Sequence, residues 1–254
     1  MIYHGLQQDK LDGQKKFAVL IDPDKIKTQN INQIIELALA SSVDYFFLGG
    51  SLIVDDEMNY CIDVIKRNTD IPVILFPGST MQVNHSADAL LFLSLISGRN
   101  ADMLIGKHVE SAPMLYRSPL EILSTGYILV DGGTSTSVLY MSNTQPIPAN
   151  KADIAVCTAL AGEMLGLKLI FMDAGSGAKH PISEKMIKAV SSKLTIPLIV
   201  GGGIRTPERA LASAKAGADI IVVGNAIEKD PRLVMEISNA VHSLTLESVR
   251  ATKT

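Results

Sequence analysis

The chain has 254 residues, of which 47% are hydrophobic and 19% are charged, and its net charge is −3. This length suits one α/β barrel, the apolar fraction can build a large core, and the slight acidic excess argues against a broad nucleic-acid surface. The two cysteines are too few for a disulfide framework, and no apolar run reaches the length of about 18 residues that spans a membrane. We therefore expect one soluble, cytoplasmic domain over residues 1–254.

The first half of the chain alternates short apolar runs with helical patterns, beginning with a polar N-terminal helix. Four apolar runs, each followed by glycine, proline or polar residues, are predicted to be strands: residues 17–21, 45–48, 73–76 and 89–93. Thr28 is expected to cap the helix after the first strand, and the next helix is expected over about residues 55–67. The connection at 81–87 is too short and polar for a helix, so the sequence predicts a barrel without its third helix.

The second half continues the alternation and brings the number of predicted strands to eight. The remaining strands are predicted at residues 127–130, 168–172, 198–200 and 220–223. Helices are expected at 102–111, at 151–165, after the capping residues Ser183 and Thr206, and after Pro231. The long connection at 134–150 is a candidate lid. Eight strands alternating with helices predict a (β/α)8 TIM barrel, whose functional groups gather at the carboxyl ends of the strands.

Residues 198–225 pair two apolar strands, each ending in glycine, around a single helix. Gly202 and Gly203 lie after one strand, and Gly224 and Asn225 follow the other. Glycine lets backbone amides approach a ligand closely, and a barrel commonly binds phosphate after strands 7 and 8. The alternative is that these glycines only permit tight turns.

Oxygen-bearing side chains end two strands on the other side of the predicted barrel. Asp22 follows the first strand and Ser51 follows the second, and such oxygens could hold a Mg²⁺ ion that bridges substrate phosphates. Asp22 could instead be a turn residue before Pro23, and Ser51 could cap a helix. Basic residues that could contact a diphosphate, or could be solvated surface charges, are Lys25, Lys107, His108, Lys179 and His180.

Seven motifs spread over nearly the whole chain carry a resemblance to a known family. They are LIDPDK (20–25), FFLGGS (46–51), LFPGST (75–80), ALLFLSLISGRN (89–100), DAGSGA (173–178), VGGGIRTPE (200–208) and VVGNAIE (222–228). Together these motifs resemble geranylgeranylglyceryl phosphate synthases, in their long second-group form, and the related bacterial heptaprenylglyceryl phosphate synthases.

The resemblance implies an enzyme that transfers a prenyl group from an allylic diphosphate, with geranylgeranyl diphosphate expected, to the sn-3 hydroxyl of sn-glycerol 1-phosphate. This would form the first ether bond of membrane ether lipids. It also implies Mg²⁺ as cofactor with Asp22 and Ser51 as ligands, and Asp22 and Asp173 as catalytic residues. The implied glycerol phosphate site consists of Phe171, Met172, Asp173, Ala174, Gly175, Ser176, Gly177, Gly202, Gly203, Gly224 and Asn225.

The ending of the sixth strand departs from the family, which usually has Tyr-Leu-Glu-Ala-Gly-Ser-Gly at this place. Phe171 lacks the tyrosine hydroxyl, and Asp173 is one methylene shorter than glutamate. Because a general base must reach the proton that it removes, Asp173 could act through a water or on a strand that lies closer. Loose candidates for an apolar prenyl groove are Leu91, Leu93, Tyr127, Leu139 and Tyr140.

Two other functions remain open on the sequence. One is another phosphate-binding barrel enzyme, such as a sugar-phosphate isomerase, and the other is a degenerate barrel that senses a phosphate or prenyl ligand without catalysis. The small, apolar helix at 151–165 permits a homo-oligomer. We expect no nucleic-acid partner and at most transient contact with a membrane, because no basic amphipathic anchor is evident.

Overall fold

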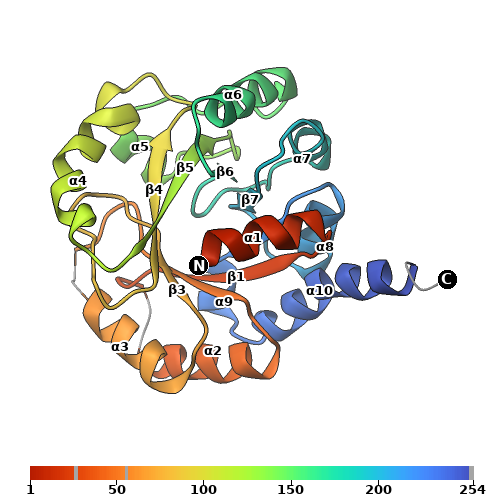
Figure 1. Ribbon diagram of the computed structural model, residues 1–254. Coiled ribbons are helices and arrows are strands. Elements are labelled where there is room, and N and C mark those ends of the chain that lie inside the picture. The colour runs from red at the N-terminus through yellow and green to blue at the C-terminus, as the bar shows by residue number, and fades with distance from the viewer. Residues whose placement is uncertain (26–27, 55–56, 252–254) are drawn as a thin grey trace.

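Eight parallel strands, each hydrogen-bonded to the next in chain order, close into a barrel in this computed structural model, which describes residues 1–25, 28–54 and 57–251 (Figure 1). β8 pairs with β1, so the sheet has no free edge. The strands are β1 Lys16–Ile21, β2 Tyr45–Leu48, β3 Val73–Leu75, β4 Ala89–Leu95, β5 Glu121–Leu129, β6 Leu169–Asp173, β7 Leu198–Gly201 and β8 Ile220–Val223. The predicted TIM-barrel fold is therefore confirmed.

Helices surround the barrel, and one helix lies across its floor (Figure 1). They are α1 Ile2–Leu11, α2 Thr28–Ala40, α3 Met58–Asn68, the π-helical turn η1 Asp102–Gly106, α4 Lys107–Tyr116, α5 Ser137–Ser142, α6 Ala152–Met164, α7 Glu184–Ser191, α8 Pro207–Lys215, α9 Asn225–Lys229 and α10 Leu233–Ala251. No helix lies between β3 and β4, as the sequence predicted. Among the described residues, none of the helices combines the length and the hydropathy that crossing a bilayer requires.

The apolar core forms two layers because successive residues of a strand point to opposite faces. Along β6, Ile170 and Met172 point outward and pack in the layer between the strands and the helices. Leu169 and Phe171 point inward and fill the barrel with side chains from the other strands. Asp173 is the last residue of β6, and its side chain lies at the mouth, where polar groups replace the apolar layer.

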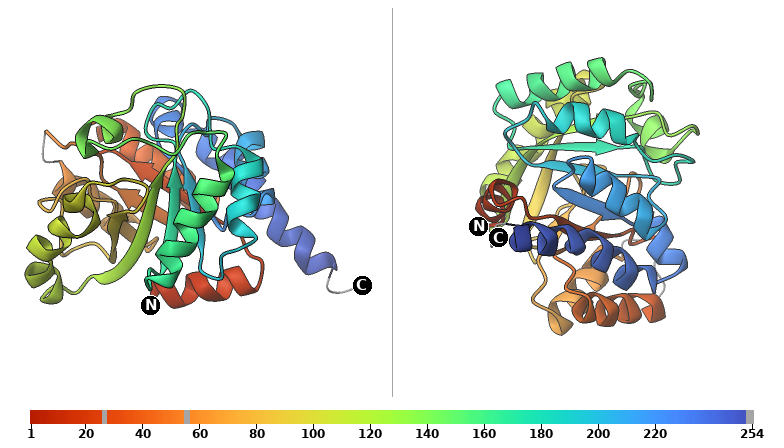
Figure 2. Two further views of the ribbon diagram at one scale, coloured as in Figure 1. Left: turned by 90° about the horizontal axis from the view of Figure 1, so that it is seen from above. Right: turned by 90° about the vertical axis from the view of Figure 1, so that its right-hand side faces the viewer.

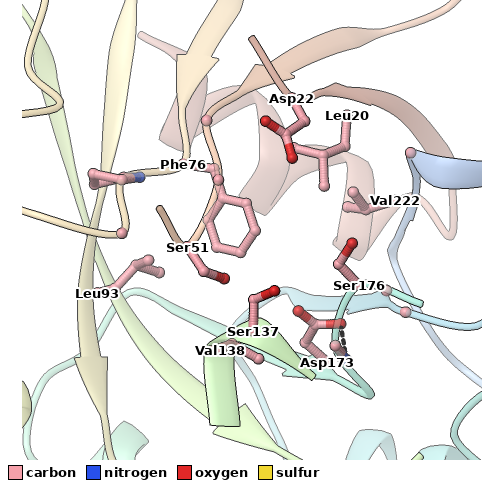
Figure 3. A pocket seen from close by; sticks show the side chains of 18 of the residues that line it. Leu20, Asp22, Ser51, Phe76, Leu93, Ser137, Val138, Asp173, Ser176 and Val222 are labelled. Atoms are coloured by element: carbon pink, nitrogen blue, oxygen red, sulfur yellow. Dashed lines mark hydrogen bonds between the residues drawn. The ribbon is translucent and has the colours of Figure 1, made fainter. Parts of the chain in front are cut away.

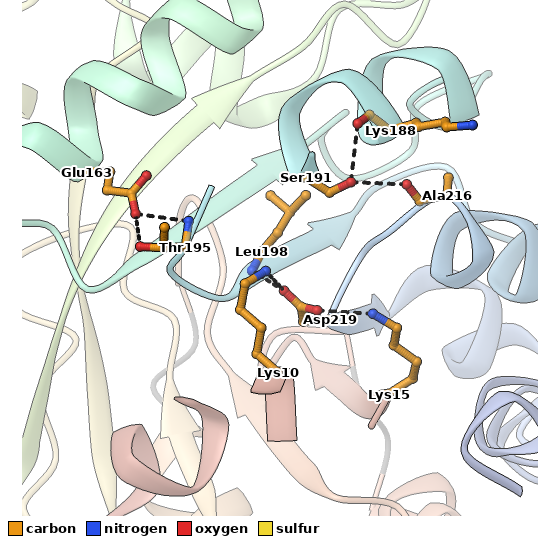
Figure 4. Close-up of polar contacts among 9 residues, drawn as sticks. All are labelled: Lys10, Lys15, Glu163, Lys188, Ser191, Thr195, Leu198, Ala216 and Asp219. Carbon is orange, nitrogen blue, oxygen red and sulfur yellow. Dashed lines mark hydrogen bonds and ion pairs between the residues drawn. The ribbon is translucent and has the colours of Figure 1, made fainter. Parts of the chain in front are cut away.

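The floor of the barrel is closed by α1 and by one buried carboxylate (Figure 4). Leu6 of α1 packs against the inward side chains of the strands. Asp219, which precedes β8, accepts hydrogen bonds from Lys10 Nζ at 2.9 Å, Lys15 Nζ at 3.0 Å and the backbone N–H of Leu198 at 2.9 Å. α1 and α5 lie at opposite ends of the barrel in the left view of Figure 2, so α1 covers the floor and α5 lies at the end where the strands have their carboxyl ends.

The largest error in the predicted elements concerns β5, which begins at Glu121 rather than at residue 127. The polar and small residues Ser124, Thr125 and Gly126 interrupt the apolar pattern, yet they pair along β4 in register. Glu121 accepts hydrogen bonds from the first amides of α1, with distances of 2.5 Å to Ile2 N and 2.9 Å to Tyr3 N. The strand thus begins with a residue that caps the floor helix, a tertiary role that strand periodicity does not reveal.

Other element boundaries differ by smaller amounts. β4 continues to Leu95, and the helix expected at 102–111 is a π-helical turn followed by α4. The connection at 134–150 is not structureless, because it contains α5 and a bridge between Val130 and Ile147. Ser183 and Thr206 cap α7 and α8 as predicted. The Thr28 side chain and the expected helix start at residue 55 lie outside the described residues.

Candidate active site

A cavity of about 770 Å³ opens at the carboxyl ends of the strands (Figure 3). Its polar end is lined by the loops after β6, β7 and β8, and by Asp22 after β1. Its apolar end lies between β4 and α4 and is lined by residues that include Leu91, Leu93 and Leu115. Ligand cavities of this size hold molecules larger than a glycerol phosphate, and the mixed lining suits a ligand with a charged head and an apolar body.

The loops after β6, β7 and β8 bring the predicted phosphate-site residues together. Gly175, Ser176, Gly177, Gly202, Gly203, Gly224 and Asn225 all line the cavity. Ser176 Oγ donates a hydrogen bond to Asn225 Oδ1 at 3.0 Å, which joins the loop after β6 to the start of α9. Backbone amides and small polar side chains in a concave loop cluster are the kind of groups that bind phosphate in proteins.

Gly202 is the position in this cluster where a side chain is least tolerable. Its φ of +79° lies in the left-handed region, and a Cβ atom there would be 2.4 Å from Asp173 Oδ1 and 2.6 Å from Ala174 N. The absence of a side chain therefore allows the β7 loop to lie directly against the end of β6.

Two residues of the segment 171–177, which was predicted to bind glycerol phosphate, do not present their side chains to this cavity. Met172 points outward into the layer between the strands and the helices, because it alternates with Phe171 and Asp173 along β6. Ala174 lines a separate, smaller cavity. Phe171 does line the main cavity, with its ring stacked on Phe76 at a centroid distance of 5.1 Å.

Asp173 is the most deeply buried carboxylate of the cavity, with 7% of the residue exposed. Tyr127 Oη donates a hydrogen bond to Asp173 Oδ2 at 2.6 Å, and the backbone N–H of Gly175 donates to Oδ1 at 2.7 Å. Burial raises the pKa of Asp173, and these two hydrogen bonds partly oppose that rise. Burial and the nearby Asp173 carboxylate raise the pKa of Tyr127 well above its ordinary value, so the phenol keeps its proton. A buried carboxylate with a raised pKa beside an anion site suits a general base.

Asp22 and Asp173 face the cavity from opposite sides (Figure 3). Asp22 pairs with the ammonium group of Lys25, and its Oδ1 accepts the backbone N–H of Asp24 at 3.3 Å. Gly50 lies close to this carboxylate, because a Cβ atom at Gly50 would be 3.2 Å from Asp22 Oδ1. The loop that carries Ser51 therefore lies beside Asp22. The Asp22 carboxylate thus lies at the mouth of the cavity, and its role as a Mg²⁺ ligand stays a prediction.

Glu228 is a second carboxylate at this side of the cavity, and the sequence analysis did not identify it. Its Oε1 accepts the backbone N–H of Asp22 at 3.3 Å, and burial raises its pKa. In the part of the chain that the structure describes, no group of three or more His, Cys, Asp or Glu residues could hold a metal ion. Any cation at Asp22 and Ser51 therefore depends on further oxygen ligands from water or a substrate.

The basic residues proposed from the sequence separate into two groups. Lys25, Lys107 and His108 line the cavity, whereas Lys179 and His180 do not. His108 packs edge-on against Phe92 with a centroid distance of 4.5 Å, and burial lowers its pKa. Arg205 and Lys229 also line the cavity, and sequence reasoning missed both. Both could have been predicted from the sequence, because each lies within a few residues of a glycine that ends a strand.

The apolar end contains some of the groove residues expected from the sequence. Leu91, Leu93 and Tyr127 line the cavity, together with Met103 and Leu115. Leu139 lines the smaller cavity instead, and Tyr140 is 85% exposed. Ser137 and Val138 of α5 complete the wall beside Asp173, so the connection at 134–150 does cover part of the mouth (Figure 3).

Comparison with known proteins identifies relatives along nearly the whole chain. Residues 11–242 match the PcrB family. A geranylgeranylglyceryl phosphate synthase from Chitinophaga pinensis is 57% identical over 95% of this chain and 96% of its own, and one from Spirosoma linguale is 51% identical over 97% and 99%.

A similar solved structure is that of (S)-3-O-geranylgeranylglyceryl phosphate synthase from Thermoplasma acidophilum, in complex with its substrate sn-glycerol-1-phosphate. It is 32% identical, covers 96% of this chain and 99% of its own, and superposes with a TM-score of 0.89. The similarity therefore extends from the sequence to the arrangement of the entire barrel.

Proposed function

The chain belongs to the PcrB family, and on that premise we propose that it is a prenyltransferase that joins a prenyl diphosphate to the sn-3 hydroxyl of sn-glycerol 1-phosphate and releases diphosphate. One observation carries this proposal. A single cavity connects the glycine-rich loops after β6, β7 and β8, a buried carboxylate and an apolar extension. A prenyl acceptor and donor need these three environments next to one another.

The acceptor phosphate is proposed to bind at the loops after β6, β7 and β8, where Ser176, Gly202, Gly203 and Asn225 line the cavity. Backbone amides and hydroxyl groups suit the three terminal oxygens of a phosphate monoester. A phosphate in this position would direct the glycerol hydroxyls toward Asp173, whose carboxylate lies against the Gly202 loop. Met172 and Ala174 support this segment through their packing rather than through side-chain contact with the acceptor.

The donor diphosphate is proposed to bind near Asp22, with its prenyl chain in the apolar end of the cavity. Asp22 and Ser51 both line the cavity, and their carboxylate and hydroxyl oxygens are of the type that Mg²⁺ takes, so they would hold the ion together with oxygens from water or a substrate. A Mg²⁺ ion held there would neutralise charge on the departing diphosphate. Lys25 lies at the same carboxylate and can contribute a second positive charge.

During the reaction, the acceptor oxygen attacks C1 of the prenyl group while the bond from C1 to the diphosphate oxygen breaks. Asp173 accepts the hydroxyl proton, because it is the buried carboxylate between the anion site and the apolar end. The apolar walls exclude water, which would otherwise compete with glycerol for an allylic carbon of cationic character. Geranylgeranyl diphosphate is the expected donor.

A homo-oligomer and a cytoplasmic location belong to the same proposal. Ile154, Met164 and Leu165 are exposed apolar side chains on and just after α6, which is the helix that the sequence offered for a subunit contact. Light scattering of the purified protein tests this contact, since a monomeric mass at micromolar concentration would remove it. The cytoplasmic location, like the single-domain extent over residues 1–254, stays a prediction from the sequence.

Incubation of the purified protein with Mg²⁺, sn-glycerol 1-phosphate and prenyl diphosphates of several lengths tests the function directly. We expect an ether-linked product and free diphosphate, detected by mass spectrometry and phosphate release, with loss of product when EDTA is added. sn-Glycerol 3-phosphate is the matched control, because it has the same charge and composition but the opposite configuration. The absence of ether product with every donor would refute the proposal and favour a sugar-phosphate enzyme or a ligand sensor.

A further inference from the structure

The acceptor side of the cavity has a phenol hydroxyl, and it comes from β5 rather than from β6. Tyr127 of β5 pairs in register with Phe171 of β6, so both side chains point into the barrel. Their rings meet edge to face at a centroid distance of 5.5 Å. Phe171 itself offers no polar atom, and Tyr127 extends past it to the carboxylate two residues further along β6.

The hydrogen bonds around Asp173 fix both of its oxygens. Tyr127 Oη donates to Oδ2 at 2.6 Å, and the Gly175 amide donates to Oδ1 at 2.7 Å. The β7 loop lies directly against this carboxylate at Gly202, where there is no room for a side chain. Each carboxylate oxygen has a second lone pair, so two donors orient the group without exhausting its capacity to accept a proton. Tyr127 is only 5% exposed and its ring packs against Phe76 and Phe171, so its hydroxyl has little freedom to turn away.

We propose that Tyr127 is a positioning residue for the reaction, which supplies from β5 the hydroxyl that Phe171 lacks and holds the Asp173 carboxylate against the acceptor hydroxyl. This inference rests on the proposed function and explains how its general base, Asp173, is held in place. The phenol compensates for the short aspartate side chain by fixing its direction. No water or movement of β6 is needed to explain how Asp173 is oriented.

The proton balance of the step follows from these hydrogen bonds. The acceptor O–H bond breaks and its proton passes to Asp173, while a new bond forms between the acceptor oxygen and C1. The electron pair of the broken C1–O bond leaves with the diphosphate. Tyr127 keeps its own proton throughout and donates to the carboxylate, in agreement with its raised pKa.

The decisive variant is Tyr127→Phe, because it removes the hydroxyl and keeps the ring packing. We expect kcat to fall by about tenfold or more, in the range of a weakened general base, while the KM for prenyl diphosphate changes little. We also expect the acidic limb of the kcat against pH profile to move to higher pH. Without the hydrogen bond from Tyr127, the buried carboxyl group of Asp173 loses its proton less readily, so its pKa rises further.

The matched control is Tyr45→Phe, which removes a buried phenol hydroxyl at the opposite end of the barrel. This control is expected to keep the wild-type pH profile. Calorimetric titration with sn-glycerol 1-phosphate establishes that Tyr127→Phe is folded and binds the acceptor. Loss of that binding would contradict the proposal, because the hydroxyl would then serve folding or binding rather than the orientation of Asp173.

An unchanged kcat and pH profile in Tyr127→Phe would also overturn the inference, as would an equal shift in Tyr45→Phe. Failure of the proposed function gives a different result, because the wild-type protein would then form no ether product at all. An active wild-type protein with an insensitive Tyr127→Phe variant would refute only the role of Tyr127.

Discussion

The two ends of the barrel each contain a buried aspartate in a different setting. Asp219 at the floor is 6% exposed and accepts hydrogen bonds from two lysine ammonium groups and a backbone amide. Asp173 at the mouth is 7% exposed but faces a cavity, and its donors among the described residues are two neutral groups, the Tyr127 hydroxyl and the Gly175 amide. The two aspartates are thus almost equally buried, but positive charges balance the charge of Asp219, whereas none of the described hydrogen-bond donors to Asp173 is charged. The floor is arranged for stability and the mouth for chemistry.

The largest expected effect comes from Asp173→Asn, which removes the charge at the mouth and keeps the shape. Turnover should fall by about 100-fold or more, because an amide cannot accept the hydroxyl proton. The melting temperature should not decrease, since the amide oxygen can still accept the Gly175 amide and the amide nitrogen can donate to Tyr127 Oη. Turnover assays and thermal unfolding measure the two effects. Turnover within tenfold of the wild type would remove Asp173 from the base position.

The same substitution at the floor, Asp219→Asn, should have the opposite outcome. Loss of the ionic hydrogen bonds to Lys10 and Lys15 should lower the free energy of unfolding by about 2 kcal/mol. The kcat of the folded protein should stay at the wild-type value, because this carboxylate lies at the closed end of the barrel. Urea unfolding, together with turnover measured well below the melting temperature, separates these quantities. A selective loss of turnover without loss of stability would contradict the division between the two ends.

Gly202→Ala perturbs the mouth without changing a charge. The new methyl group would lie within 2.4 Å of Asp173 Oδ1, so the β7 loop and the end of β6 must move apart. We expect the KM for sn-glycerol 1-phosphate to rise by about tenfold, with a stability loss of about 1–3 kcal/mol from the strained backbone. Gly166→Ala is a suitable control, because Gly166 also has a positive φ but has open space around its Cβ position. If both variants keep the wild-type KM, the Gly202 loop does not hold the acceptor.

The smallest expected effect is a difference in the pH dependence of stability between the wild type and Asp173→Asn. Because the pKa of Asp173 is raised in the folded state, folding favours its protonated form. The stability of the wild type relative to Asp173→Asn is therefore highest below the ordinary aspartate pKa, and it decreases as the pH rises through the raised value. Urea unfolding of both proteins at several pH values measures this difference. A relative stability that increased with pH would show that Asp173 is stabilised as a carboxylate.

The barrel could be predicted from the sequence because buried parallel strands produce short apolar runs that end in glycine or polar residues. The missing third helix was equally visible, since residues 81–87 lack the length and apolar spacing of a helix. The start of β5 was predicted wrongly because Glu121, Ser124 and Thr125 are polar. Their places depend on α1 and on the pairing with β4, which are tertiary contacts.

The candidate site was predictable to the level of strand ends but not of side-chain contacts. Asp22, Ser51, Asp173 and Gly202 all line the cavity, because the carboxyl ends of parallel strands meet at one rim. Met172 does not face the cavity, because side chains alternate along β6 and Asp173 faces it. This alternation could have been predicted from the sequence. The hydrogen bond from Tyr127 to Asp173 was not predictable, because it depends on the register between β5 and β6.

The most direct test of this account is a crystal structure of the protein with sn-glycerol 1-phosphate bound. We predict the phosphate among Ser176, Gly202, Gly203 and Asn225, with the sn-3 hydroxyl within hydrogen-bond distance of Asp173, at about 2.6–3.2 Å. The Tyr127 hydroxyl should remain on Asp173 in that complex. A phosphate bound at Asp22, or an sn-3 hydroxyl directed away from Asp173, would contradict the assignment of the two sides of the cavity.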